Sequence, residues 1–111
     1  MPNDEDIQKQ IEHDNIVKAL SFYNYEGFVS DLLNKGVFEP GDHYISIDKT
    51  DEYPVFLKIR YSDENYLMYD YTVDEFEKIL TKLRDAKIKD YPEEQENYTE
   101  LTNKLIAKLR Q

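Results

Sequence analysis

The stretch YISIDKTDEYPVFLKIRYSDENYLMYDYTVDE, residues 44–75, decides the fold. From Tyr44 onward apolar and polar residues alternate with a period of two, whereas the apolar residues before it recur at helical spacing. The alternation predicts three short strands, at 44–48, 55–61 and 67–71. Because short turns separate them, the strands are expected to form an antiparallel meander.

The turn between the second and third strands sets the expected register of the meander. Asp63-Glu64-Asn65 suits a three-residue hairpin loop with Asn65 in the left-handed conformation. This register places Ile59 opposite Tyr69, Leu57 opposite Tyr71 and Lys58 opposite Asp70. A slip by one residue would bury Asp70, which argues against it.

Two helices are predicted after the meander. Thr72 and Glu75 match a capping box that opens a helix, and its apolar face is expected to contain Phe76, Ile79, Leu80 and Leu83. Pro92 suits the first position of a last helix, and the apolar stripe of this helix is formed by Tyr98, Leu101, Leu105 and Leu109.

The N-terminal third also has helical periodicity. Ile7 and Ile11 form one stripe and residues 16–23 form another, offset by one residue, so a bend near residues 14–15 is expected. A second helical face at residues 28–33 ends at Gly36, which suits the left-handed position after a helix. The expectation is a single α+β domain over residues 1–111: N-terminal helices, a three-stranded antiparallel meander and two C-terminal helices.

Charge is distributed unevenly along the chain. The formal net charge is −10, and residues 1–74 hold 16 acidic side chains against 6 basic ones, whereas residues 75–111 hold 8 of each. The sequence has no cysteine, no secretory signal and no apolar run long enough to cross a bilayer. We therefore expect a cytoplasmic protein that does not bind membranes and whose acidic part attracts cationic partners.

Groups that carry catalysis are scarce. His13 and His43 are the only histidines, and both are expected to be solvated at the surface. The three glycines are isolated and form no phosphate-binding loop, and no serine lies in a nucleophile elbow. The sequence predicts no enzyme, no cofactor and no metal site.

Carboxylates and tyrosines are the abundant functional groups, and six of the ten tyrosines lie between Tyr44 and Tyr71. A meander returns the end of its third strand to the turn between the first two, so Asp48, Asp51, Glu52, Asp70 and Asp74 are expected to share one end of the sheet. Tyrosines among carboxylates are typical of protein-binding surfaces. The full set predicted to contact a partner is Asp48, Asp51, Glu52, Tyr53, Asp63, Glu64, Tyr66, Asp70 and Asp74.

These features favour a protein that inhibits a basic, nucleic-acid-binding protein by presenting carboxylates in place of phosphates. Residues 44–74 hold 7 acids against 3 bases, so direct binding of nucleic acid is disfavoured. Small acidic anti-CRISPR and antirestriction proteins act in this way, and the order of elements resembles one such anti-CRISPR group at the level of the fold alone.

Two alternatives remain open at this point. The first is an immunity protein or antitoxin that neutralises a basic nuclease. The second is a regulatory adaptor that uses the C-terminal helical pair, from Phe76 to Leu109, as a docking or homodimer face.

Overall fold

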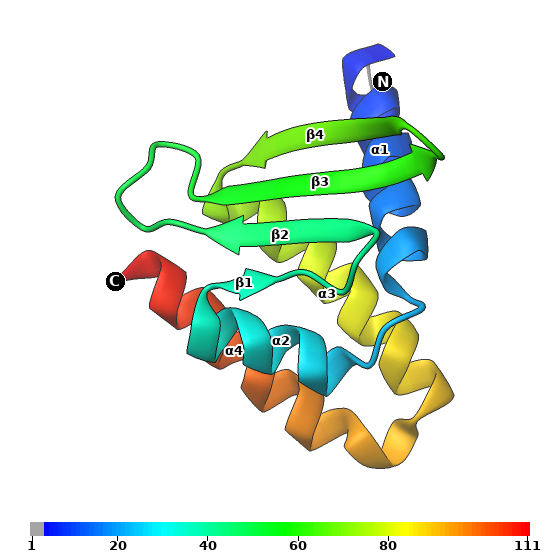
Figure 1. Ribbon diagram of the computed structural model, residues 1–111. Coiled ribbons are helices and arrows are strands. Elements are labelled where there is room, and N and C mark those ends of the chain that lie inside the picture. The colour runs from blue at the N-terminus through cyan, green and yellow to red at the C-terminus, as the bar shows by residue number, and fades with distance from the viewer. Residues whose placement is uncertain (1–3) are drawn as a thin grey trace.

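The alternating segment forms an antiparallel sheet, and the periodic segments form helices against it (Figure 1). The computed structural model describes residues 4–111, apart from the side chain of Tyr61. The side chain at the end of the strand predicted over 55–61 therefore lies outside the described part of the chain. In chain order the elements are α1 Asp4–Leu20, α2 Tyr25–Lys35, β1 Val37–Phe38, β2 His43–Ile47, β3 Val55–Ser62, β4 Asn65–Tyr71, α3 Val73–Asp90, a 3-10 turn Pro92–Glu94 and α4 Gln95–Arg110.

The α+β class is confirmed, but the described sheet has four strands rather than three, in the order β1-β2-β3-β4. The additional strand, β1, pairs Val37 with Ser46 and Phe38 with Ile45. Gly36 continues this pairing, because its carbonyl accepts a hydrogen bond from Ile47 N at 3.0 Å. A strand of two residues is too short to show an alternation, which is why the sequence pattern did not reveal it.

The predicted hairpin register is wrong by two residues. In the structure Ile59 lies opposite Leu67, Leu57 opposite Tyr69, Val55 opposite Tyr71 and Lys58 opposite Met68. The turn contains only Asp63 and Glu64, with an irregularity in the ladder between Arg60 and Ser62, and no described residue other than glycine has a positive φ. Because the shift is even, the residues from Val55 to Ile59 and from Leu67 to Tyr71 keep their expected faces.

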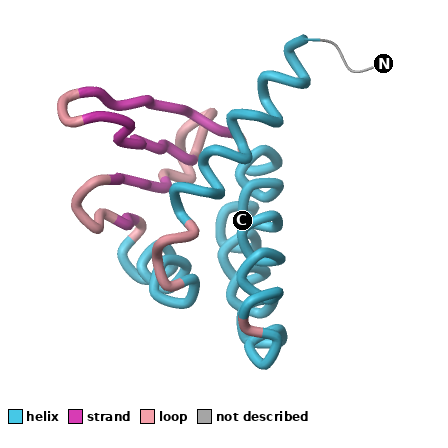
Figure 2. Tube along the Cα trace, turned by 90° about the vertical axis from the view of Figure 1, so that its right-hand side faces the viewer, coloured by secondary structure: helices cyan, strands magenta, loops and turns pink. Residues whose placement is uncertain are grey.

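The core lies between one face of the sheet and the helices (Figure 2). Among the inward residues of the strands, Ile45, Val55 and Leu57 are fully buried. The apolar face predicted for α3 is buried as expected, with Phe76, Ile79, Leu80 and Leu83. On α4, Tyr98, Leu105 and Leu109 are buried and Leu101 is half-buried. Burial of each large side chain contributes about 1.5–3 kcal/mol.

The helix α1 runs without a break from Asp4 to Leu20, so the offset between its two apolar stripes does not divide it into two helices. Instead the two stripes differ in burial. Ile16 and Leu20 lie in the core, whereas Ile7 and Ile11 are 44% and 50% exposed. The amino-terminal half of α1 projects beyond the edge of the sheet in both views of the backbone (Figures 1 and 2).

Local capping determines where the inner helices begin and end. The predicted capping box is present: Glu75 N donates to Thr72 Oγ1 and Thr72 N donates to Glu75 Oε1, both at 3.2 Å. Gly36 adopts φ +74° after α2, and its N–H donates to the carbonyl of Leu32. Pro92 opens a 3-10 turn rather than the first turn of α4. These caps fix the position of α3 directly after β4.

Candidate protein-binding site: the acidic end of the sheet

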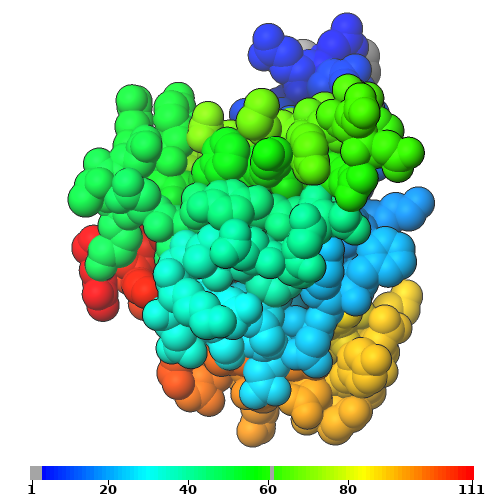
Figure 3. Space-filling model, viewed as in Figure 1, coloured from blue at the N-terminus to red at the C-terminus, as the bar shows by residue number. Residues whose placement is uncertain are grey.

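The ends of three strands bring several predicted site residues to one end of the sheet. β2 ends at Ile47, β3 begins at Val55, and β4 ends at Tyr71, which lies opposite Val55. The loop 48–54 and Asp70 therefore share this end, and the loop protrudes from the left side of the molecule in Figure 3. We call this surface the acidic end and define it by Asp48, Asp51, Glu52 and Asp70, all of which are exposed.

Two of the carboxylates at the acidic end also shape the loop. Asp48 Oδ1 accepts hydrogen bonds from Thr50 N at 3.0 Å and from Thr50 Oγ1 at 2.7 Å. These bonds, the side-chain bond first, hold the pKa of the Asp48 carboxyl below its ordinary value. Asp51 Oδ1 accepts from Tyr53 N at 3.0 Å. Such turns reduce the conformational freedom of the loop.

The charges of the acidic end are not neutralised by neighbouring bases. Within residues 4–111, none of its four carboxylates forms an ion pair, and the only basic residue in the loop is Lys49. Elsewhere on the described surface many acids are paired, as Asp14 is with Lys82 at 3.2 Å. Uncompensated charge on a protruding loop produces a local negative potential that attracts cationic surfaces.

Asp74 lies at the same end of the sheet but in a different environment. It lies in the first turn of α3, next to the end of β4, as the meander topology predicts. However, Arg110 at the end of α4 donates to Asp74 Oδ1 at 2.8 Å and also to Glu77. This pairing partly neutralises Asp74, so its contribution to the negative potential is smaller than that of the four unpaired acids.

Three predicted site residues lie at the opposite end of the sheet. Asp63 and Glu64 form the β3–β4 turn, and Tyr66 follows it. There the Arg60 guanidinium contacts Asp42 at 2.8 Å and Asp63 at 4.0 Å. The nine predicted residues therefore do not form one surface. A hairpin separates its turn from its open end by the whole length of the strands, and the sequence list combined both ends.

Aromatic side chains border the acidic end. Tyr53 lies in the loop and is 46% exposed. On the outer face of the sheet the rings of Tyr44 and Phe56 are in contact, with their centroids 6.0 Å apart, and Phe56 lies opposite Asp70. Phe56 was not among the predicted site residues, although its even position in the alternating β3 segment already placed it on the outer face. The acidic end thus combines charge with apolar area.

The histidines lie in environments that differ from the sequence expectation. His13 is buried rather than solvated, because it precedes Ile16 and Leu20 on the inward face of α1. Its ring meets the ring of Tyr71 edge-on, with centroids 5.7 Å apart, and its Nε2 has no hydrogen-bond partner in the described residues. His43 is half-buried, and Tyr23 Oη lies 2.5 Å from its Nδ1. Burial lowers the pKa of both imidazoles.

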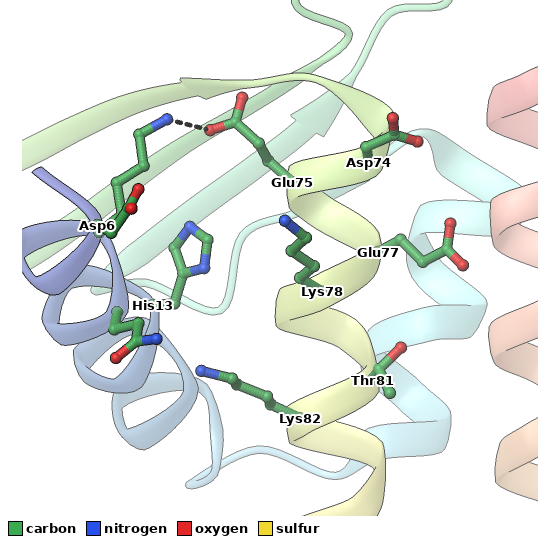
Figure 4. Close-up of a pocket in the computed structure, with 10 residues that line it drawn as sticks. Asp6, His13, Asp74, Glu75, Glu77, Lys78, Thr81 and Lys82 are labelled. Carbon is green, nitrogen blue, oxygen red and sulfur yellow. Dashed lines mark hydrogen bonds and ion pairs between the residues drawn. The ribbon is translucent and has the colours of Figure 1, made fainter. Parts of the chain in front are cut away.

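His13 lies at the wall of a cleft between α1 and α3 (Figure 4). Both acidic and basic side chains line this cleft, including Lys9, Glu75 and Lys82. Lys9 is already bound to Glu75 at 3.2 Å, and Lys82 to Asp14. Such compensated charges do not define a preference for an anion or a cation.

Comparisons with other proteins do not assign this fold to a family. Neither the protein-family models, nor the curated proteins, nor the solved structures match the chain. Among residues 4–111 no group of three or more histidine, aspartate or glutamate side chains is placed to hold a metal ion. No helix in this part of the chain has both the length and the apolar character needed to cross a membrane.

Proposed function

We propose that this protein binds and inhibits a basic, nucleic-acid-binding protein through the acidic end of its sheet. The observation that carries the proposal is that Asp48, Asp51, Glu52 and Asp70 converge at one end of the sheet, all exposed and without ion pairs in the described structure. Arg and Lys side chains that bind phosphates also bind carboxylates. A basic partner would therefore accept this surface in place of nucleic acid.

The carboxylates that would replace phosphates lie on a loop rather than along a strand. Same-face residues two apart on a strand are ~6.7 Å apart, twice the ~3.4 Å phosphate rise along one DNA strand. However, Asp70 is the only acid among the outward residues of β4. Three of the four carboxylates belong to the loop 48–54. The acidic end would therefore attract a basic partner by its local density of negative charge, and it does not reproduce a regular row of phosphates.

Tyr53 is the proposed apolar anchor of the interface. It lies within the acidic loop, beside Asp51 and Glu52, and is about half exposed. Interfaces that are steered by charge commonly obtain most of their binding energy from a few aromatic anchors. Charge would therefore set the rate and orientation of approach, and Tyr53 would slow dissociation.

The alternative of an immunity protein or antitoxin involves the same surface and a narrower class of partner, a basic nuclease.

The alternative of an adaptor that docks through its C-terminal helical pair loses its main support. The apolar stripes of α3 and α4 on which it relied are packed in the core. The outward face of α4 is instead mainly polar, with Glu96, Glu100 and Lys104.

The test is capture of a partner from a lysate of the cells in which the gene is found, followed by identification of the bound protein. Wild type is compared with the variant D51N/E52Q/D70N, which spares Asp48 because its Oδ1 accepts two hydrogen bonds in the loop. Asp51→Asn keeps an amide oxygen that can accept the one bond from Tyr53 N. The matched control is D90N/E93Q/E96Q, which removes the same charge from exposed, unpaired acids near the α3–α4 turn. We expect wild type and the control to retain a basic protein that duplex DNA displaces, and the acidic-end variant to lose it. Equal capture by both variants would refute the proposal.

A further inference from the structure

The main-chain hydrogen bonds show which groups of β4 are unused. Asp48 N donates to Pro54 O at 2.7 Å, so these two residues form a hydrogen-bonded pair between β2 and β3. Successive residues of a strand direct their main-chain groups to opposite sides. Val55, Leu57 and Ile59 therefore bond to β4, through their partners Tyr71, Tyr69 and Leu67.

The intervening residues of β4 consequently direct their N–H and C=O groups away from the sheet. These residues are Tyr66, Met68 and Asp70. β4 is the last strand in the described sheet order, so no described strand receives these groups. The side chains are accessible as well, since Leu67 and Met68 are 44% and 64% exposed. An open, mostly uncharged edge of this kind is a template for pairing with another strand.

The helix layer extends further than the sheet at this edge. The amino-terminal half of α1 projects past β4 in Figure 1, and Figure 2 shows the same helix extending beyond the strands. It carries the exposed Ile7 and Ile11, and Ile11 shares a surface hollow with Tyr69 of β4. A strand added ~4.8 Å beyond β4 would lie over this half of α1. Its inward side chains would cover Ile7 and Ile11.

We infer that the β4 edge binds an extended segment of a cationic partner as a fifth strand of the sheet. This inference rests on the proposed function for the charge of the partner. The acids nearest this edge are Asp70 on the outer face, Glu12 in the hollow beside Tyr69, and Asp4 and Glu5 in the first turn of α1. Of the bases near it, Lys9 is paired with Glu75 and Lys58 lies over the Tyr66 ring. A segment that alternates apolar and basic residues fits both requirements, with apolar side chains toward Ile7 and Ile11 and basic ones toward Asp70. A second copy of this chain would bring a net charge of −10 against the same acids.

The probe is a synthetic peptide of alternating lysine and valine with the length of β4, and the readout is amide hydrogen exchange measured by NMR. In the free protein we expect slow exchange at Leu67, Tyr69 and Tyr71 and fast exchange at Tyr66, Met68 and Asp70. The peptide should slow exchange at these last three amides. A peptide N-methylated at alternate amides retains the charge and cannot pair, so it should give no protection. The variant D51N/E52Q/D70N is measured in parallel and should still show protection at Tyr66 and Met68.

Two variants of this chain test the same edge. Met68→Pro removes one outward N–H, and Met68→Thr is the control that keeps it. Because one net main-chain hydrogen bond contributes about 1 kcal/mol, the proline variant should bind the peptide on the order of fivefold more weakly than the threonine control.

The outcomes separate this inference from the proposed function. Peptide-induced shifts confined to residues 48–54, without protection on β4, would overturn the edge pairing and leave the acidic end as the binding surface. Protection of the three amides that depends on protein concentration and needs no peptide would identify a second copy as the occupant, and would also overturn it. Protection on β4 together with partner capture that is insensitive to D51N/E52Q/D70N would support the edge and refute the acidic end.

Discussion

The hydroxyl of Tyr71 donates a hydrogen bond to Glu12 Oε2 at 2.7 Å and so connects the end of β4 to the middle of α1. Burial, followed by the neighbouring Glu12 carboxylate, raises the pKa of Tyr71 well above its ordinary value. The phenol therefore remains a donor at any physiological pH. This contact and the ring contact between Tyr71 and His13 hold α1 beneath the β4 edge.

Removal of the Tyr71 hydroxyl should loosen this connection. We expect Tyr71→Phe to lower the free energy of unfolding by about 1–2 kcal/mol, because the half-buried Glu12 carboxylate loses a hydrogen bond. Tyr69→Phe is the matched control, since no hydrogen bond is recorded for its hydroxyl among the described residues. Urea denaturation of both variants measures the difference. Equal stability of the two variants would show that the bond to Glu12 contributes nothing net.

His13 should make stability depend on pH. Burial lowers its pKa in the folded protein below the ordinary value of 6.5, so the unfolded chain binds more protons than the folded one as pH falls through 6.5. Stability must therefore decrease as pH is lowered from 6.5 toward the folded pKa, and be fully retained above 6.5. His43 contributes in the same direction.

We expect His13→Met to flatten part of this decrease, and NMR titration of the two imidazoles to give both pKa values below 6.5. Unfolding free energies measured across this pH range test the first expectation. A His13 imidazole that titrates above 6.5 in the folded protein would contradict the burial described for it.

Substitution by alanine should change the stability of the protein in opposite directions at two glycines. Gly36 has φ +74°, a conformation that costs an L-residue about 1–2 kcal/mol, so Gly36→Ala should destabilise the protein by about that amount. Gly27 lies in the first turns of α2, where an added Cβ would meet its nearest atom at 3.6 Å. Gly27→Ala should therefore stabilise α2 by roughly 0.5–1 kcal/mol. Thermal unfolding of the two variants measures the direction of each change in stability. Destabilisation by both substitutions would contradict the backbone conformation described for α2.

Arg110 should reduce the negative potential at the acidic end. Its pairing with Asp74 and Glu77 is exposed, so Arg110→Gln should change stability by less than about 1 kcal/mol. The substitution frees two carboxylates beside the acidic end and should speed association with the captured basic partner. Lys104→Gln removes the same charge from an exposed pair on α4 and is the control. Stopped-flow association rates that are equal for the two variants would exclude a contribution from Asp74.

Much of the fold could be predicted because local signals and burial agree. The Thr72–Glu75 capping box and the alternation from Val55 to Ile59 each specify one local geometry. The register was harder, since the two-residue turn together with the irregularity between Arg60 and Ser62 leaves the same side chains inward as a regular three-residue loop would. The strand β1 was not predicted, because its pairing depends on the contact of Gly36 and Val37 with β2. This tertiary contact leaves no periodic pattern in the sequence.

The candidate site was predicted only in part. Meander topology correctly returned Asp70 and Asp74 to the loop that contains Asp51. It could not show that Arg110, at the far end of the chain, would pair with Asp74. Nor could it show that His13 would be buried, because Ile7 and Ile11 suggested a different inward face for α1.

Whether the acidic end steers binding is tested most directly by the association rate of the captured partner, measured against ionic strength for wild type and D51N/E52Q/D70N. If the acidic end steers binding, the wild-type rate should fall steeply as salt rises, while the variant should start slower and depend less on salt. The control D90N/E93Q/E96Q should follow the wild type. A wild-type rate that does not change with salt, or that falls in parallel with that of the acidic-end variant, would contradict the account.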